Sequence, residues 1–136
     1  MLFRSGDVTS SGWIIDTGCS YHMCPNREWF TTYKEVDGET INMGSDQSCK
    51  TVGIGSVRIK MHDGVVRTLV NVRHIPDLRK GLISLGMLES KGCKVVAIGG
   101  VLKVVHGSTV VMKGIRQRNL YPLLGKVVTS EKSWAE

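Results

Sequence analysis

A chain of 136 residues and 15.0 kDa is long enough for one domain with a modest hydrophobic core. Apolar residues make up 41% of it and charged residues 22%, which is typical of a folded globular protein and excludes an intrinsically disordered chain. The sequence has neither an apolar run of membrane-spanning length nor a signal-peptide pattern, so we expect no membrane contact.

The net charge of +6 comes largely from Lys and Arg in the second half of the chain. Such an excess favours an anionic partner, for example RNA. Few aromatic residues lie between the basic ones, so the pattern does not predict a stacking platform for single strands. We therefore expect weak, nonspecific RNA contact as a secondary property and not as the main function.

The two ends of the chain differ from its middle. Residues 1–11 are polar and contain several Ser and Gly residues, which is typical of a flexible linker. Residues 125–136 are expected to be a flexible C-terminal tail. Residues 12–124 form the predicted folded domain, and their short apolar runs separated by Gly-containing turns predict a mostly β structure.

The predicted elements begin with a buried strand over residues 11–16, because an apolar run ends at Ile15. Pro25 and Asn26 indicate a turn. A short helical turn is expected to follow over residues 27–30.

The middle of the chain predicts strands joined by turns. A short strand is expected over residues 41–43, and the polar segment 44–48 follows it. Apolar residues mostly alternate from Lys50 to Met61, which predicts a strand with one buried face. The Asp63-Gly64 pair is typical of a tight hairpin turn, so residues 65–72 are expected to return as the partner strand.

The last third of the domain begins with a second apolar strand over residues 82–85. A helix of one or two turns is expected over residues 86–91, with Gly92 closing its C-terminus. Gly-containing turns then separate three further β segments, which are predicted over residues 93–98, 101–105 and 109–112.

Asp16-Thr17-Gly18 is the most informative motif of the sequence. A carboxylate on a tight turn after a buried strand is how an aspartic protease presents its catalytic group. The triplet occurs once, whereas that chemistry needs two carboxylates. A catalytic interpretation therefore predicts a homodimer with its active site on the two-fold axis. The alternative is an ordinary surface turn, in which Asp and Gly are common.

The four cysteines are irregularly spaced. We expect them to be reduced, small and mostly buried side chains. Cys19, His22 and Cys24 could bind zinc only with a distant fourth ligand such as Cys49, and their spacing fits no common structural zinc pattern. The sequence therefore predicts neither a metal nor a cofactor.

The stretch from Trp13 to Met23 reads WIIDTGCSYHM, and it resembles the catalytic motif of the retropepsins in copia-type LTR retrotransposon polyproteins. Residues 70–76, 82–88 and 119–123 resemble later motifs of that family, in the same order. The resemblance covers about residues 12–124. It implies an all-β fold, a retropepsin-like closed barrel or sandwich with one short helix, that dimerises to share one active site.

The resemblance also implies a role for each residue of the catalytic loop. Asp16 would act with the Asp16 of a second copy, one carboxylate activating a water while the other, protonated, polarises the scissile carbonyl. The Thr17 hydroxyl would bond across the dimer, and Gly18 would allow close approach of the backbone. Cys19 and Ser20 would support the loop.

A flap over the substrate is implied for the hairpin from Ile41 to Ile54. An ordinary surface hairpin is the alternative. The residues expected at the tip of the flap are Gly44, Ser45, Asp46 and Gln47.

A second apolar motif, Ile83-Ser84-Leu85-Gly86, is implied to lie with its helix beneath the catalytic loop. Either Ser84 or Gly86 could take the position of the glycine that the family has there. His22 is expected to pack or to hydrogen-bond near the loop.

The implied function is that of a dimeric aspartic endopeptidase that processes its own Gag-Pol polyprotein, in the cytoplasm within virus-like particles. Two other functions stay open. One is a weakly active or inactive dimerisation module on the same fold. The other is a basic nucleic-acid-binding β-domain, in which Asp16 is only part of a turn.

Overall fold

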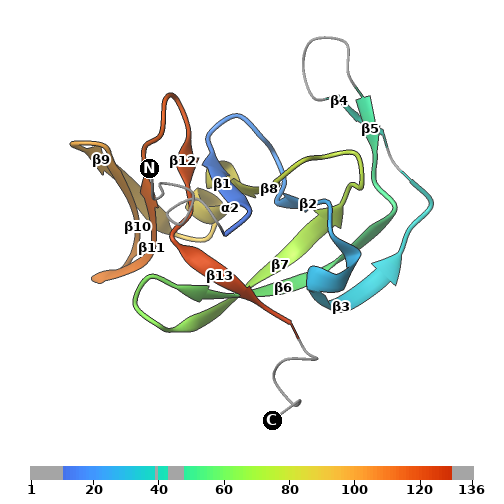
Figure 1. Cartoon of the computed structure of the whole chain (residues 1–136), viewed down its shortest axis with the longest axis horizontal. Helices are drawn as coiled ribbons and strands as arrows, with labels where there is room; N and C mark the ends of the chain where they lie inside the picture. The colour runs from blue at the N-terminus through green and yellow to red at the C-terminus, as the bar shows by residue number, and fades with distance from the viewer. Residues whose placement is uncertain (1–10, 39, 43–47, 130–136) are drawn as a thin grey trace, which may run out of the picture.

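The computed structural model describes residues 11–38, 40–42 and 48–129. In these residues the chain is mostly β, with three sheets, one short α-helix and one 3₁₀ turn (Figure 1). Neither of these helical segments has the length that crossing a membrane would require.

The largest sheet has eight strands in the order β12-β1-β8-β2-β7-β6-β13, with β3 paired to β6. β1 lies inside this sheet, parallel to β8 on one side and antiparallel to β12 on the other. The strands are β1 (Trp13–Asp16), β2 (Met23–Cys24), β3 (Phe30–Glu35), β6 (Gly53–Met61), β7 (Val66–His74), β8 (Gly81–Ser84), β12 (Tyr121–Pro122) and β13 (Gly125–Val128).

Two smaller sheets lie on opposite sides of the large one (Figure 1). One has three strands, β9 (Cys93–Ile98), β10 (Val101–His106) and β11 (Thr109–Ile115). The other is the hairpin of β4 (Thr40–Asn42) and β5 (Ser48–Lys50). The helix α2 (Leu85–Ser90) follows β8 directly, and the 3₁₀ turn η1 (Arg27–Trp29) precedes β3.

One main hydrophobic core joins the large sheet to the three-stranded sheet. Alternate residues of the long strand β6, such as Val57 and Ile59, are fully buried, as its apolar alternation predicts. Leu102 and Val104 of β10 belong to the same core. Burial of each such side chain is worth about 1.5–3 kcal/mol, so the C-terminal strands stabilise the sheet that carries β1.

The predicted all-β architecture with one short helix is confirmed for the described residues, but the predicted closed barrel is not. The strand order runs from β12 to β13, and no pairing between those two strands closes it in this part of the chain. Only Leu123 and Leu124 separate the two strands, and β13 leaves β12 to pair with β6 instead.

The predicted ends of the domain need correction. Gly125–Val128 forms β13 where a flexible tail was predicted, because Val127 lies opposite Ile59 and packs against the core. Ser11, which was assigned to the linker, is buried, and its Oγ accepts a hydrogen bond from the Trp13 amide. Residues 1–10 and 130–136 lie outside the described residues.

The sharpest steric constraint in the large sheet is at Gly55 of β6. A Cβ there would collide with the backbone carbonyl of Thr32 in β3. We predict that Gly55→Ala lowers the free energy of unfolding by about 1–3 kcal/mol, since a β-strand carbonyl cannot move aside cheaply. Urea denaturation measures the change.

The matched control is Gly86→Ala in α2, where the nearest atom to the new Cβ would be the Ser84 Oγ, at 3.7 Å. That substitution should leave stability unchanged or raise it by up to about 1 kcal/mol. Equal stability of the Gly55→Ala variant and the wild type would contradict the strand packing described above.

Candidate functional site

Asp16 is the last residue of β1, and the strand holds it in place from both sides. The parallel register sets Trp13 opposite Gly81 and Asp16 opposite Ser84, while Ile14 lies opposite Pro122 of β12. The apolar residues before Asp16 are buried, whereas Asp16 itself is half-buried. A carboxylate is therefore carried to the surface at the end of a strand that pairs with β8 along its whole length and with β12 at Ile14 and Ile15.

The turn after β1 fixes the direction of the carboxylate. The Gly18 amide donates a hydrogen bond of 2.6 Å to Asp16 Oδ1, which closes an Asx turn. A Cβ on Gly18 would lie only 3.3 Å from that oxygen, so glycine lets the turn close tightly. Thr17, Gly18 and Ser20 are exposed and Cys19 is half-buried, so this loop is open to a partner or a substrate.

The second apolar motif lies beneath this loop, and Ser84 makes the link. Its Oγ donates to the Cys19 carbonyl at 2.8 Å and accepts from the Met87 amide at 3.2 Å. The first bond holds the loop, and the second caps the N-terminus of α2. Ser84 is fully buried, so each bond satisfies a polar group that water cannot reach.

The other motif residues play different parts. Ile83 is fully buried in the main core, and Leu85 starts α2 with its side chain in the same core. Gly86 lies one residue further into the helix, away from the contact with Cys19. Ser84, and not Gly86, is therefore the residue that meets the loop.

His22 forms the second link between the loop and β8. Its Nδ1 accepts a 3.0 Å hydrogen bond from the Ser84 amide, so the neutral ring carries its proton on Nε2. Burial and, to a smaller extent, the positive charge of Lys91 together lower the pKa of His22 from 6.5 to about 4. The residue thus works as a neutral acceptor that aligns the two segments.

Cys19 stands beside Asp16 but is poorly suited to nucleophilic chemistry. Burial, and then the negative charge of Asp16, raise the pKa of its thiol to about 11. His22 cannot activate it as a base through Nδ1, because that nitrogen is occupied by the Ser84 amide. Neither Cys19 nor His22 is therefore a candidate nucleophile or base, which leaves the Asp16 carboxylate as the candidate catalytic group of this loop.

The zinc ligands considered from the sequence have other partners. His22 Nδ1 accepts from Ser84, and Cys24 Sγ donates to the Asn26 carbonyl at 3.5 Å. Burial raises the pKa of Cys24 to about 12. Across the described ranges no three His, Cys, Asp or Glu side chains gather as metal ligands would.

The strands of the expected flap are present as the β4–β5 hairpin, in which Ile41 lies opposite Cys49. This hairpin extends away from the large sheet (Figure 1). It ends at Lys50, and β6 begins separately at Gly53, so the hairpin is shorter than the span predicted to Ile54. The expected tip, Gly44 to Gln47, lies outside the described residues.

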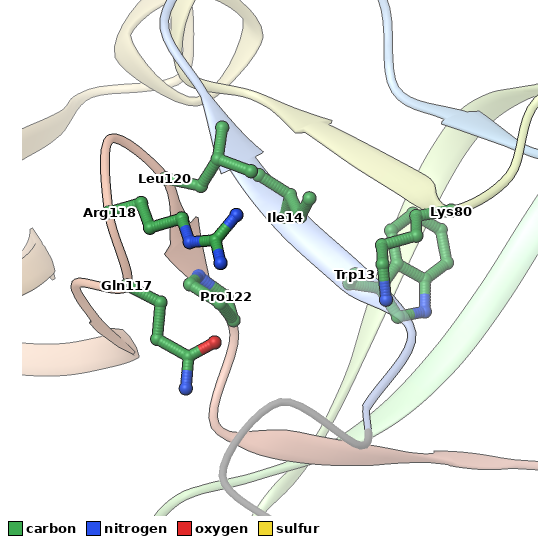
Figure 2. A pocket seen from close by; sticks show the side chains of 7 residues that line it. All are labelled: Trp13, Ile14, Lys80, Gln117, Arg118, Leu120 and Pro122. Carbon is green, nitrogen blue, oxygen red and sulfur yellow. The ribbon is translucent and has the colours of Figure 1, made fainter. Parts of the chain in front are cut away.

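A pocket of about 500 Å³ opens beside β1. Figure 2 shows Arg118 and Lys80 on opposite sides of Ile14. Side chains two residues apart share one face of a strand, so Ile14 lies on the face of β1 that carries Asp16. Sequence reasoning missed this pocket, because Lys80 and Arg118 reach its lining only through the pairing of β1 with β8 and β12. Its lining consists of Trp13, Ile14, Lys80, Gln117, Arg118, Leu120 and Pro122.

The position of His22 predicts a pH-dependent stability. The unfolded chain binds a proton at His22 below pH 6.5, whereas the folded chain does so only below about pH 4. Stability should therefore fall as the pH drops from 6.5 towards 4, by on the order of 3 kcal/mol from this group.

His22→Asn keeps an acceptor for the Ser84 amide and does not titrate. Urea denaturation at several pH values should show a shallower acid-side loss for the variant, and equal losses would contradict the assigned role.

Residues 13–93 match the family described as the Pol polyprotein, beta-barrel domain. The retrovirus-related Pol polyprotein from transposon TNT 1-94 of Nicotiana tabacum is 34% identical over 126 residues, which are 93% of this chain and 10% of that protein. The putative transposon Ty5-1 protein of Saccharomyces cerevisiae is 38% identical over 76 residues, 56% of this chain and 49% of that protein. No solved structure matches significantly. The chain spans less than half the length of either relative, and it belongs to the family of Pol polyprotein β-barrel domains.

Proposed function

We propose that this domain is one half of a retropepsin-like aspartic endopeptidase of a copia-type retrotransposon, and that two copies pair to form the active site. One observation carries the proposal. The Asp16 carboxylate is fixed at the end of a buried strand by the Gly18 amide, on a loop that Ser84 holds from beneath. A surface turn without a function needs neither the buried serine nor the buried histidine.

The chemistry follows from bringing two such loops together. Two carboxylates a few ångströms apart cannot both ionise, so they share one proton and titrate as a unit. The ionised Asp16 takes a proton from water, and the water attacks the peptide carbonyl. The protonated Asp16 of the second copy polarises that carbonyl. The tetrahedral intermediate then collapses, its C–N bond breaks, and the first Asp16 gives the proton it took from water to the leaving amine. The exposed Thr17 hydroxyl is available to bond across the dimer and hold the loops together.

The proposed substrate is an extended segment of the polyprotein that contains the domain. Both relatives are named as transposon proteins, and one of them is a Pol polyprotein of which the chain spans 10%. The pocket beside Ile14 offers a place for a substrate side chain on the Asp16 face of β1. The β4–β5 hairpin is the proposed flap, and the proposed setting is a cytoplasmic virus-like particle.

A second candidate function is a dimerisation module without efficient catalysis. It is compatible with the family description, which names a β-barrel domain. The Asp16 loop would then be a contact surface between copies. Both functions predict a dimer, and they differ in whether the dimer cuts peptides.

We predict that Asp16→Asn lowers peptide cleavage about 1,000-fold or more, because an amide can neither take nor share the proton. Asp77→Asn, at an exposed turn before β8, is the matched control and should keep full activity. Digestion of a peptide library followed by mass spectrometry, between acidic and neutral pH, measures both. Cleavage that survives in the Asp16→Asn variant would refute the proposed chemistry.

Sedimentation over a concentration series separates the two candidate functions. A dimer in both the wild type and Asp16→Asn, with cleavage only in the wild type, supports the endopeptidase. A dimer that cuts no peptide at any pH supports the dimerisation module. A monomer at every concentration would exclude both functions for the chain alone.

A further inference from the structure

The outer face of the three-stranded sheet carries aliphatic side chains beside lysines. We call it the lysine–aliphatic face and define it by five residues that line a hollow of about 350 Å³. Ile98 is 75% exposed and Val96 43% exposed, which is unusual for large aliphatic side chains. The five residues are Val96, Ile98, Val101, Lys103 and Lys113.

The strand register arranges this face in rows. Val101 of β10 lies between Ile98 of β9 and Ile115 of β11, which makes an aliphatic row. In the next row Lys103 lies between Val96 and Lys113. The other side of the sheet, with Leu102, Val104 and Met112, is buried in the main core, so only the lysine–aliphatic face is free to meet a partner.

Among the described residues, no salt bridge balances the positive charge on this face. Lys103 and Lys113 lie directly opposite each other, and like charges in that position destabilise a sheet. Neither lysine has a salt bridge among the described residues. The sequence from Cys93 to Val128 contains no Asp or Glu at all. The two facing ammonium groups lie next to aliphatic side chains. A partner that fits this face therefore carries both anionic and apolar groups.

We propose that the lysine–aliphatic face binds an extended acidic peptide segment of a partner protein. The carboxylates pair with Lys103 and Lys113, and an aliphatic side chain of the peptide enters the hollow near Ile98 and Val101. Val101 and Lys103 are two residues apart, about 7 Å along the strand. An extended peptide with Leu at one position and Glu two positions later presents its side chains at the same spacing.

Two other occupants fit the face less well. A second copy of this chain would set lysines against lysines, since a two-fold contact places the same patch on both sides. RNA would meet the lysines, but the face offers aliphatic side chains in place of the aromatic rings on which bases stack. An acidic peptide satisfies both the charge and the apolar surface.

The test is a fluorescence anisotropy titration of the whole chain with a labelled peptide that alternates Leu and Glu along one face and carries Ser on the other. The Lys103→Glu/Lys113→Glu variant should bind this peptide at least about 10-fold more weakly than the wild type does. It should instead bind the peptide in which Lys replaces Glu. Because Asp16 is not part of the face, Asp16→Asn should bind normally whether or not the domain is a protease.

The structure offers a matched control in a second pair of facing lysines. Lys60 of β6 lies opposite Lys126 of β13, and both are exposed. Lys60→Glu/Lys126→Glu changes the net charge equally and should bind the Leu–Glu peptide within about 2-fold of the wild type. Ile98→Ser leaves every charge in place and should weaken binding several-fold, which tests the aliphatic contribution without charge reversal at the sheet.

Three results would overturn the proposal. One is no saturable binding of the Leu–Glu peptide by the wild type at low salt. Another is an equal loss of affinity in both double variants, which would show an effect of net charge alone. The third is tighter binding of oligouridylate than of the peptide, lost in the Lys103→Glu/Lys113→Glu variant, which would assign the face to RNA.

Discussion

The parallel pairing of β1 with β8 is the constraint on which the rest of the structure depends. It sets Asp16 beside Ser84, and Ser84 makes three hydrogen bonds with two polar groups: its amide donates to His22, while its hydroxyl donates to the Cys19 carbonyl and caps α2. Parallel strands need a long connection, and residues 17–80 supply it with β2 to β7 and the β4–β5 hairpin. A buried serine that lost one of these bonds would leave an unsatisfied group, so the loop, the strand and the helix are positioned together.

This arrangement supports the proposal of a shared active site. The hydroxyl of Ser84 holds the loop through the Cys19 carbonyl, while the other loop residues are exposed. A second copy can therefore contact the loop without breaking this hydrogen bond. The neighbouring groups stay neutral near neutral pH, because the pKa of the Cys19 thiol is raised to about 11 and that of the His22 ring lowered to about 4. In the proposed dimer, a proton would therefore be shared between the two Asp16 carboxylates and not with either of these groups.

Local patterns in the sequence predicted the elements that depend on neighbours in the chain. The strand before Asp16, the Asp63-Gly64 hairpin turn and the helix after Ser84 all carry such signals, and all are present. Strands β12 and β13 were missed, because each is short and exists only through pairing with a strand far away in the sequence. Apolar and polar residues alternate only weakly along β3, so its sequence gave little indication of a strand. The pocket beside Ile14 depends on the same distant pairings, whereas the lysine–aliphatic face depends on the register of three consecutive strands. The second motif left Ser84 and Gly86 open, and only the hydrogen bond of Ser84 to Cys19 distinguishes them.

The central claim is that two copies of the Asp16 loop make one active site, and mixing of subunits tests it most directly. Wild-type and Asp16→Asn chains are mixed at constant total concentration, allowed to exchange, and assayed for cleavage. If each site needs both carboxylates, activity falls with the square of the wild-type fraction, to about one quarter in an equal mixture. A linear fall, to about one half, would show that one chain carries a complete site and would contradict the account.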